Sequence, residues 1–316
     1  MKVRNMKINN FKTGILILLF VLSIFPMEVN AMDISINWGN AEDELGFYNK
    51  NVKSYRDEGE PSGPSSLFVD DMGNFYITDT FNKKIKKFSI SGRFLESIGT
   101  KDPCFDYLLD IKVVDGIIYF IDGEKSQIIK YQNNKIIARI GGYGKDNGKF
   151  VQPHQIEIGP DGKIYVGDRG KLSIEVFSND GKYLMNFPWN LNSFSITDNN
   201  RVLIMNYEEK KGYTVNEYNP QTKSLVEKFS VGNKNLTRAG VTGIDKSGYI
   251  TCRFSYYGTN NIVFQTFNKK GKKIKEYEAQ YSTDVREACI MSIGKIFCLQ
   301  YDSFTAPLDG VIIHIE

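Results

Sequence analysis

The sequence predicts an all-β fold, a six-bladed β-propeller of four-stranded antiparallel blades. One pattern recurs along the chain at intervals of roughly 40 to 45 residues, which is the spacing of propeller blades. The recurring segments are rich in β-branched and aromatic residues and alternate as strands do, and helical periodicity is absent after the N-terminal segment. Because one such unit cannot bury both of its faces alone, the units are expected to pack around a common axis.

The first 31 residues have the layout of a secretory signal peptide. Four basic residues, the last of them Lys12, precede a largely apolar run from Gly14 to Phe25, and Ala31 is a small residue suited to cleavage. The run has twelve residues, whereas a membrane-spanning helix needs about 20. We therefore expect an extracytoplasmic, secreted protein with no stable membrane span after cleavage. An uncleaved N-terminal membrane anchor is the alternative.

The charge of the remaining chain is balanced. The whole sequence has 40 Lys+Arg and 37 Asp+Glu, and the leader holds four of the former and one of the latter, so 36 of each remain. A nucleic-acid partner is not expected, since such proteins carry a basic surplus. The local clusters Lys83–Lys87 and Lys269–Lys273 lie in or beside predicted turns, and we expect them to be solvated strand ends.

Three copies of the repeat are clear. They begin at Gly73, Gly116 and Gly162, and each has a glycine turn, an apolar stretch closed by Asp, a polar gap and a strand ending on an aromatic residue. Weaker copies begin at Arg201, Gly248 and Gly294. In each clear copy the interval from the Asp to the aromatic residue is nine residues: Asp79 to Phe88, Asp122 to Tyr131, Asp168 to Phe177. In the weaker copies Asn206, Arg253 and Gln300 take the place of the Asp.

The repeated Asp residues are predicted to be structural. Because they are equivalent in successive copies, their expected role is to accept backbone N–H groups in the turn that follows the second strand. A catalytic cluster should instead depart from the repeat.

The two ends of the chain are predicted to meet. The last copy has only three apolar strands, and an isolated strand, Ile34 to Trp38, follows the leader. We predict that residues 33–38 supply the outer strand of blade six, which closes the ring and removes an unpaired edge.

The stretch from Pro64 to Gly99 resembles an NHL repeat, on Pro64, Asp70, Gly73, Asp79, Asn82, Ile85, Phe88, Gly92 and Gly99. The copy from Pro153 to Phe187 resembles it nearly as well. With the leader described above, the resemblance divides the chain into a signal peptide, 1–31, and an NHL-type propeller, 32–316. Similar rings bind proteins or RNA, or act as lyases and hydrolases, so the family implies a scaffold and no single activity.

Residues that open the innermost strands should form a ring at one mouth of the central channel. His154 takes this position in blade three, Ser65 in blade one, and Asn192 and Glu287 in later blades, with Arg286 beside Glu287. These five residues are the candidate ligand-binding set. The alternative for His154 is an ordinary solvated imidazole.

No cofactor is predicted. The segment 153–170 resembles peptidyl-hydroxyglycine amidating lyases, propellers that hold zinc through several histidines, but the whole chain has only two histidines. Catalytic zinc normally has three protein ligands. Sugar-lactone hydrolases on similar rings hold calcium through carboxylates and amides, and calcium wants six or more oxygens. Asn192 and Glu287 are too few to predict it, so calcium stays an open alternative.

Of the four cysteines, Cys289 and Cys298 are candidates for a disulfide. A two-residue turn at Ile293 and Gly294 would place them opposite each other, at a non-hydrogen-bonded site where Cα atoms are about 4.5 Å apart. That distance lies within bridging range. The alternative is four buried thiols.

We expect a monomeric, non-enzymatic binding module that recognises a protein, peptide or glycan on one propeller face. The alternative is a hydrolase or lyase, similar to the lactonases or the amidating lyases, with its active site at the channel mouth. A third reading is a structural wall or surface-layer protein, which would self-associate.

Overall fold

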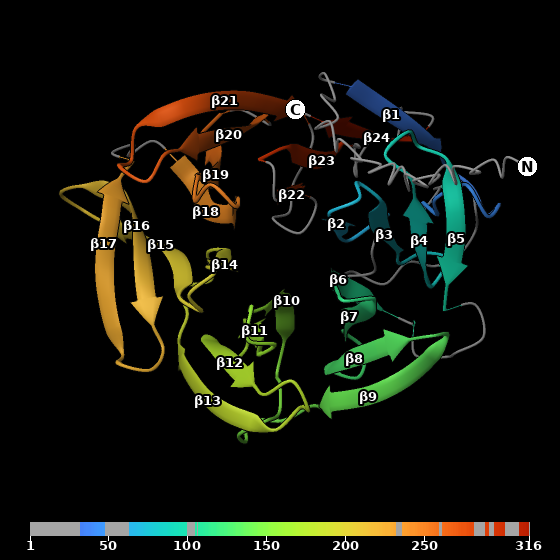
Figure 1. The fold of residues 1–316 in the computed structure, drawn as a ribbon, viewed down its shortest axis with the longest axis horizontal. Coiled ribbons are helices and arrows are strands. Elements are labelled where there is room, and N and C mark those ends of the chain that lie inside the picture. The colour runs from blue at the N-terminus through green and yellow to red at the C-terminus, as the bar shows by residue number, and fades with distance from the viewer. Residues whose placement is uncertain are drawn as a thin grey trace, which may run out of the picture.

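The computed structural model describes residues 32–47, 63–99, 105, 107–231, 236–258, 261–280, 288–290, 294–300 and 310–315. Within these ranges the chain forms six four-stranded antiparallel sheets arranged in a ring, as Figure 1 shows. The same ranges contain no helix that is long and apolar enough to cross a membrane. The predicted six-bladed propeller is confirmed.

Each of blades one to five uses four consecutive strands, from the channel outward. Blade one has β2 (Leu67–Val69), β3 (Phe75–Asp79), β4 (Lys84–Phe88) and β5 (Phe94–Ile98); blade two has β6 (Leu108–Val114), β7 (Ile117–Asp122), β8 (Gln127–Gln132) and β9 (Lys135–Gly141). Blade three has β10 (Pro153–Ile158), β11 (Ile164–Asp168), β12 (Ser173–Phe177) and β13 (Tyr183–Pro188). Blade four has β14 (Phe194–Ile196), β15 (Val202–Glu208), β16 (Gly212–Asn219) and β17 (Ser224–Ser230), and blade five has β18 (Leu236–Ile244), β19 (Ile250–Tyr256), β20 (Asn261–Phe267) and β21 (Lys273–Gln280).

The burial of each strand follows from its place in the blade. The second strands β3 and β11 are buried along their whole length, because both of their faces pack against neighbouring blades. The outer strand β13 alternates between partly buried and exposed residues over most of its length, since one of its faces meets solvent. The turn before each second strand needs a residue with positive φ, which is a glycine in five blades and Asn200 in blade four. The φ angles in chain order are 80° at Gly73, 73° at Gly116, 75° at Gly162, 55° at Asn200, 78° at Gly248 and 81° at Gly294.

Blade six is built from both ends of the chain. Its strands are β22 (Ala288–Ile290), β23 (Ile296–Gln300), β24 (Gly310–Ile315) and, outermost, β1 (Met32–Asn37). β1 and β24 pair in antiparallel register from Met32 opposite Ile315 to Asn37 opposite Gly310. The predicted closing strand is therefore present in the structure.

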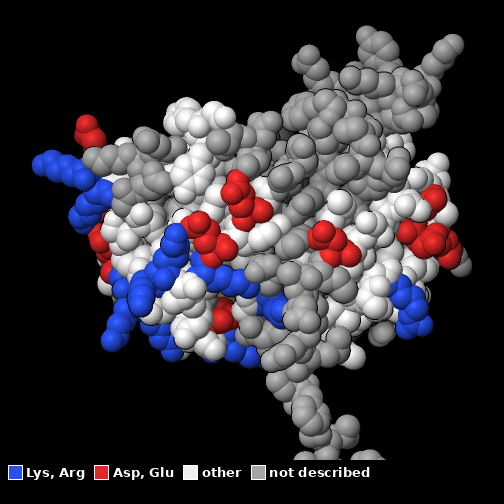
Figure 2. Space-filling model, turned by 90° about the horizontal axis from the view of Figure 1, so that it is seen from above, with Lys and Arg blue, Asp and Glu red and all other residues white. Residues whose placement is uncertain are grey.

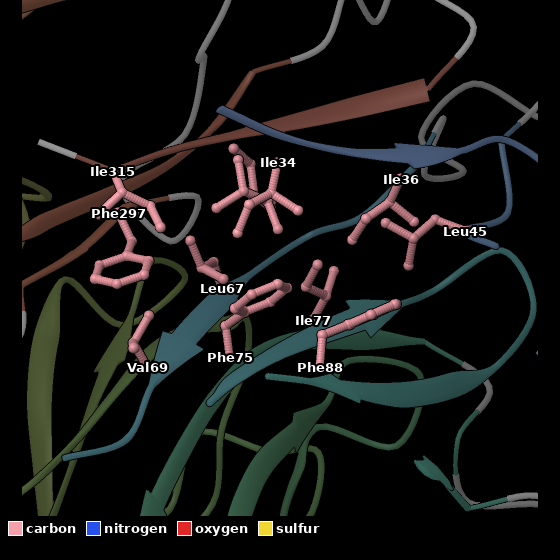
Figure 3. Close-up of a cluster of buried hydrophobic side chains, with 12 residues drawn as sticks. Ile34, Ile36, Leu45, Leu67, Val69, Phe75, Ile77, Phe88, Phe297 and Ile315 are labelled. Carbon is pink, nitrogen blue, oxygen red and sulfur yellow. The ribbon is translucent and has the colours of Figure 1, made fainter. Parts of the chain in front are cut away.

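A buried apolar cluster joins this closing blade to blade one (Figure 3). Ile34 and Ile36 of β1 point toward Phe75 and Phe88 of blade one. Phe75 and Phe88 stack with ring centroids 5.4 Å apart. Burying this much apolar surface stabilises the junction at which the ring closes.

A buried ion pair in blade one holds the segment that follows β1. The Lys86 ammonium lies 3.1 Å from the Asp79 carboxylate, and both side chains are fully buried. Lys86 also donates to the carbonyls of Ala41 and Glu44, and the N–H of Gly46 donates to Asp79 at 2.9 Å. The expectation that the Lys83–Lys87 cluster is solvated is therefore wrong for Lys86, because β1 and its following loop cover this face of blade one.

Inner strands are linked from blade to blade by side-chain hydrogen bonds. The buried Asp110 of blade two accepts hydrogen bonds from the Ser66 hydroxyl of blade one at 2.6 Å and from the Ile156 N–H of blade three at 2.9 Å. Gln155 donates to the Phe194 carbonyl of blade four at 2.7 Å. These bonds fix the relative positions of the strands that surround the channel.

On the rim, basic and acidic side chains lie among one another, as Figure 2 shows for one side. Several of them form exposed ion pairs within or between the outer strands: Lys211 with Glu227 at 2.7 Å, Lys228 with Glu217 at 3.2 Å and Lys273 with Glu276 at 2.5 Å. Local pairing of opposite charges is therefore typical of this surface.

Candidate ligand-binding site

The repeated Asp residues have the structural role predicted for them. Asp168 is fully buried and accepts the N–H groups of Val151, Gln152 and Gly170 at 2.8 to 2.9 Å. Asp122 accepts the N–H of Lys125 at 3.1 Å. Since these buried carboxylates are bonded to nearby backbone and lysine groups, the candidate site lies elsewhere.

A pocket of about 450 Å³ opens at the mouth of the channel between blades three, four and five. Its lining comes from the start of β10, the loop after β11, the connection between β13 and β14, the start of β18, and β19. The residues that line it are His154, Gln155, Arg169, Trp189, Leu191, Asn192, Ser193, Arg238, Ala239, Gly240 and Arg253. All of these segments lie at one end of their blades, so the pocket belongs to one face of the propeller.

The wall from blade three is held by a two-way amide bond. Gln155 is buried, and besides donating to the Phe194 carbonyl it accepts from the Phe194 N–H at 3.3 Å. This pairing joins β10 to β14. His154, the residue before Gln155, is 6% exposed and lines the pocket.

The connection between blades three and four forms a rigid wall. The indole N–H of Trp189 donates to the Asn192 carbonyl at 2.5 Å, and the Asn192 amide donates to the Met205 carbonyl at 2.8 Å. The Trp189 ring lies so close to Gly167 that a Cβ there would be 2.8 Å from it. The tryptophan and asparagine donors are therefore used to shape the pocket.

Blade five approaches this wall closely at Gly240. A Cβ at Gly240 would lie 2.2 Å from the Ser193 hydroxyl oxygen, and that hydroxyl donates to the Val241 carbonyl at 2.7 Å. Gly240 is directly opposite Arg253 in the pairing of β18 with β19, and Arg238 is opposite Ser255. The missing side chain at Gly240 leaves room beside the Arg253 side chain.

The five predicted site residues have different outcomes. His154 and Asn192 both line the pocket. Ser65 does not line it, because it lies before β2 in blade one, where its buried hydroxyl is hydrogen-bonded to that of Thr80 at 2.8 Å. Arg286 and Glu287 lie outside the described residues. The ligand-binding role of the set stays a prediction.

Sequence reasoning missed Arg169, Arg238, Arg253 and Trp189. A signal was available for Arg253, since it occupies the position that Asp79, Asp122 and Asp168 hold in the clear copies. An arginine in place of a turn-binding carboxylate is a departure from the repeat. No comparable signal marks Arg238, whose position depends on how β18 pairs with β19.

The predicted facing pair of Cys289 and Cys298 is wrong by one residue. β22 and β23 pair with Ala288 opposite Cys298 and Cys289 opposite Phe297. Successive residues of a strand point to opposite faces, so this shift removes the geometric basis for the disulfide. Cys298 is buried, and its thiol donates to the Leu299 carbonyl at 3.6 Å. Within the part of the chain that the structure describes, no group of three or more His, Cys, Asp or Glu residues is arranged to hold a metal ion.

Comparisons with known proteins agree with the fold. No family model matches the chain. NHL repeat-containing protein 3 of Homo sapiens is 28% identical over 199 residues, which is 58% of this chain and 50% of that protein. The chain thus spans about half the length of this curated relative. The resemblance to NHL-repeat proteins is confirmed.

Solved structures with the same fold include an enzyme and a calcium-binding protein. Virginiamycin B lyase from Staphylococcus aureus superposes with a TM-score of 0.51 at 14% identity, covering 85% of this chain and 82% of that one. The calcium-binding protein regucalcin from Agrobacterium tumefaciens gives 0.51 at 11% identity, covering 80% and 89%. At these identities the likeness concerns the fold alone. The chain is a six-bladed β-propeller with NHL repeat-containing homologues.

Proposed function

We propose that this protein is an exported binding module without catalytic activity of its own, which recognises a protein, peptide or glycan at the mouth of the propeller channel. The observation that carries the proposal is the pocket shared by blades three, four and five. Its volume of about 450 Å³ lies in the range of about 300 to 1,000 Å³ that is typical of ligand sites. Its walls are held by hydrogen bonds between blades, so the site is formed before a ligand arrives. Export is proposed from the sequence of residues 1–31.

Exposed aromatic side chains on the same face support a docking role. Tyr207, 53% exposed, is near the end of β15, and Tyr257, 74% exposed, directly follows β19. These strand ends point to the face on which the pocket opens. Tyrosine is enriched at interfaces because it has an apolar ring and a polar hydroxyl. A ligand that enters the pocket would extend across these rings.

A hydrolase or lyase is the second candidate, favoured by the position of His154 in the pocket wall. Imidazole is the side chain most often used as a general base. This alternative predicts that a bound ligand is turned over and that His154→Gln abolishes turnover while binding remains.

The pocket offers a matched pair of variants for testing the proposal. Leu191 and Leu172 are both exposed, both have positive φ (68° and 54°), and only Leu191 lines the pocket. The full-length wild-type chain is screened on glycan and peptide arrays, and each hit is titrated against Leu191→Trp and Leu172→Trp. We expect Leu191→Trp to weaken binding about tenfold, a loss of about 1.4 kcal/mol, and Leu172→Trp to bind as wild type does.

Equal binding by the two variants would place the ligand elsewhere, and the absence of any array ligand would contradict a glycan- or peptide-binding role. Mass spectrometry of each recovered hit shows whether it has been chemically changed, which would favour the enzyme.

A further inference from the structure

We infer that the pocket binds an oxyanion, namely a carboxylate, sulfate or phosphate group carried by an organic ligand. The inference rests on the proposed function and names the chemistry of its ligand. Three arginines from two blades, Arg169, Arg238 and Arg253, line the pocket together with His154. None of the described residues that line it is Asp or Glu.

The strand register directs two of these arginines to the same place. Arg253 of β19 is directly opposite Gly240 of β18, and Arg238 is two residues before Gly240. Directly opposite residues and residues two apart on a strand share a face of the sheet, so both arginines project from one face of blade five, opposite to the face on which Cys252 packs against blade four. Such diagonal neighbours are about 7 to 8 Å apart, a separation that one anion can bridge. Both guanidinium groups are positively charged, so both attract an anion that lies at this place.

The donors available to a ligand are mainly the charged ones. The Trp189 indole donates to the Asn192 carbonyl, the Asn192 amide to Met205, and the Ser193 hydroxyl to Val241. A guanidinium has five N–H donors in a planar fork, so an arginine that already has a partner retains donors for a ligand. This fork matches two oxygens of a carboxylate, sulfate or phosphate.

The pocket differs from the rim in its charges. On the rim, Lys211, Lys228 and Lys273 each have a glutamate partner within 3.2 Å. Arg238 is exposed and forms no ion pair with an acidic residue in the described ranges. A volume of about 450 Å³ also exceeds what a single small ion occupies. These features favour an acidic group on a larger molecule, with the neutral remainder lying toward Leu191.

The test compares an acid with its neutral counterpart. Binding of sodium glucuronate and of glucose to the full-length chain is measured by isothermal titration calorimetry and by the shift of Tm at constant ionic strength. Sodium sulfate and sodium phosphate form two further arms that distinguish the anion type. We expect at least one of the three anions to bind and to raise Tm, and glucose to do neither.

Variants locate the anion. Arg238 is exposed and lines the pocket, and we expect Arg238→Gln to weaken anion binding about tenfold. Arg93→Gln, an exposed arginine of the β4–β5 turn in blade one, is the matched control and should bind as wild type does. Arg253→Lys retains the charge without the fork and should weaken binding as well. Raising the sodium chloride concentration should weaken binding in the wild type.

Three results would overturn the inference: no anion binds, glucose binds as well as glucuronate, or Arg238→Gln and Arg93→Gln lose the same affinity. The proposed function fails separately. A neutral array ligand whose binding is weakened by Leu191→Trp would support the proposed binding function and contradict the inference that the ligand carries an oxyanion.

Discussion

Ser66 donates a hydrogen bond of 2.6 Å to a carboxylate oxygen of Asp110, and through this bond the inner strand of blade one is joined to that of blade two. The other carboxylate oxygen accepts the Ile156 N–H of blade three. Gln155, the neighbour of Ile156, is bonded to Phe194, and Ser193 is bonded to Val241. One continuous series of bonds thus runs from blade one to blade five and ends in the walls of the pocket.

Asp110→Ala should destabilise the ring strongly. The change removes a carboxylate that is 2% exposed and leaves the Ile156 N–H without its acceptor. Hydrogen bonds to a charged group contribute about 1.5 to 3 kcal/mol each, so a loss of about 3 kcal/mol or more in the free energy of unfolding is expected. Urea denaturation measures it. Ser66→Ala should cost about half as much. Ser89→Ala, at a half-buried serine of the β4–β5 turn, should change the free energy of unfolding by about 0.5 kcal/mol or less. A result for Asp110→Ala similar to that for Ser89→Ala would contradict the role given to the carboxylate.

Lys86→Ala should also be costly, because it leaves the Asp79 carboxylate buried without its cation. Breaking a buried ion pair from one side costs about 3 to 5 kcal/mol. The same denaturation experiment should show a smaller loss for the double variant Lys86→Met with Asp79→Asn than for Lys86→Ala alone. A double variant less stable than Lys86→Ala would contradict the expectation that a buried carboxylate without its cation is more costly than the loss of both charges.

Glu157 is expected to give part of the stability a pH dependence. Burial raises the pKa of its carboxyl, while the Lys112 ammonium at 3.1 Å lowers it. A raised pKa means that the folded chain binds this proton more tightly than the unfolded chain, so the contribution is full below the ordinary value of 4.5 and is lost as pH rises above it. Glu157→Gln should therefore gain stability relative to wild type as pH increases through that region.

The control for this trend is Glu276, which is exposed and whose pKa is lowered by the hydrogen bond from Lys273. Its contribution is lost as pH falls, so Glu276→Gln should show the opposite and smaller trend. Urea denaturation of both variants on either side of pH 4.5 distinguishes the two signs. Parallel trends in the two variants would contradict the assignment for Glu157.

Cys252 should be inert in the folded protein. It is fully buried in the core between blades four and five, and burial raises the pKa of its thiol. Reaction with iodoacetamide needs the thiolate, so alkylation at Cys252 should be slow in buffer and fast in denaturant. Peptide mass spectrometry locates the modified residue. Equal rates in the two conditions would show that this core opens readily.

The ring was predictable because its determinants are local and repeated. Gly73 and Gly162 open the same turn, Asp79 and Asp168 follow equivalent strands, and an isolated strand at Ile34 matches a blade that lacks one. The period fixes the number of blades, and the binary pattern fixes which residues face a neighbour.

The candidate site was only partly predictable, because it is built from contacts between blades. His154 and Asn192 could be placed by their position in the repeat, whereas Arg238 reaches the pocket through the register of β18 with β19. The Cys289 prediction failed for a related reason, since a turn longer or shorter by one residue exchanges the two faces of a strand. Lys86 appeared solvated only because the chain that covers it is distant in sequence.

The pairing of β1 with β24 also orders the events of folding. Of the strands that the structure describes, β1 is synthesised first and β24 last, so β1 has no partner strand until β24 is available. Contacts so far apart in sequence form slowly. A prematurely terminated chain without β24 would leave β1 without a partner strand and one edge of β23 open, and such chains are expected to be removed by proteolysis or to aggregate. The sixth sheet is therefore complete only in chains that have been synthesised through β24.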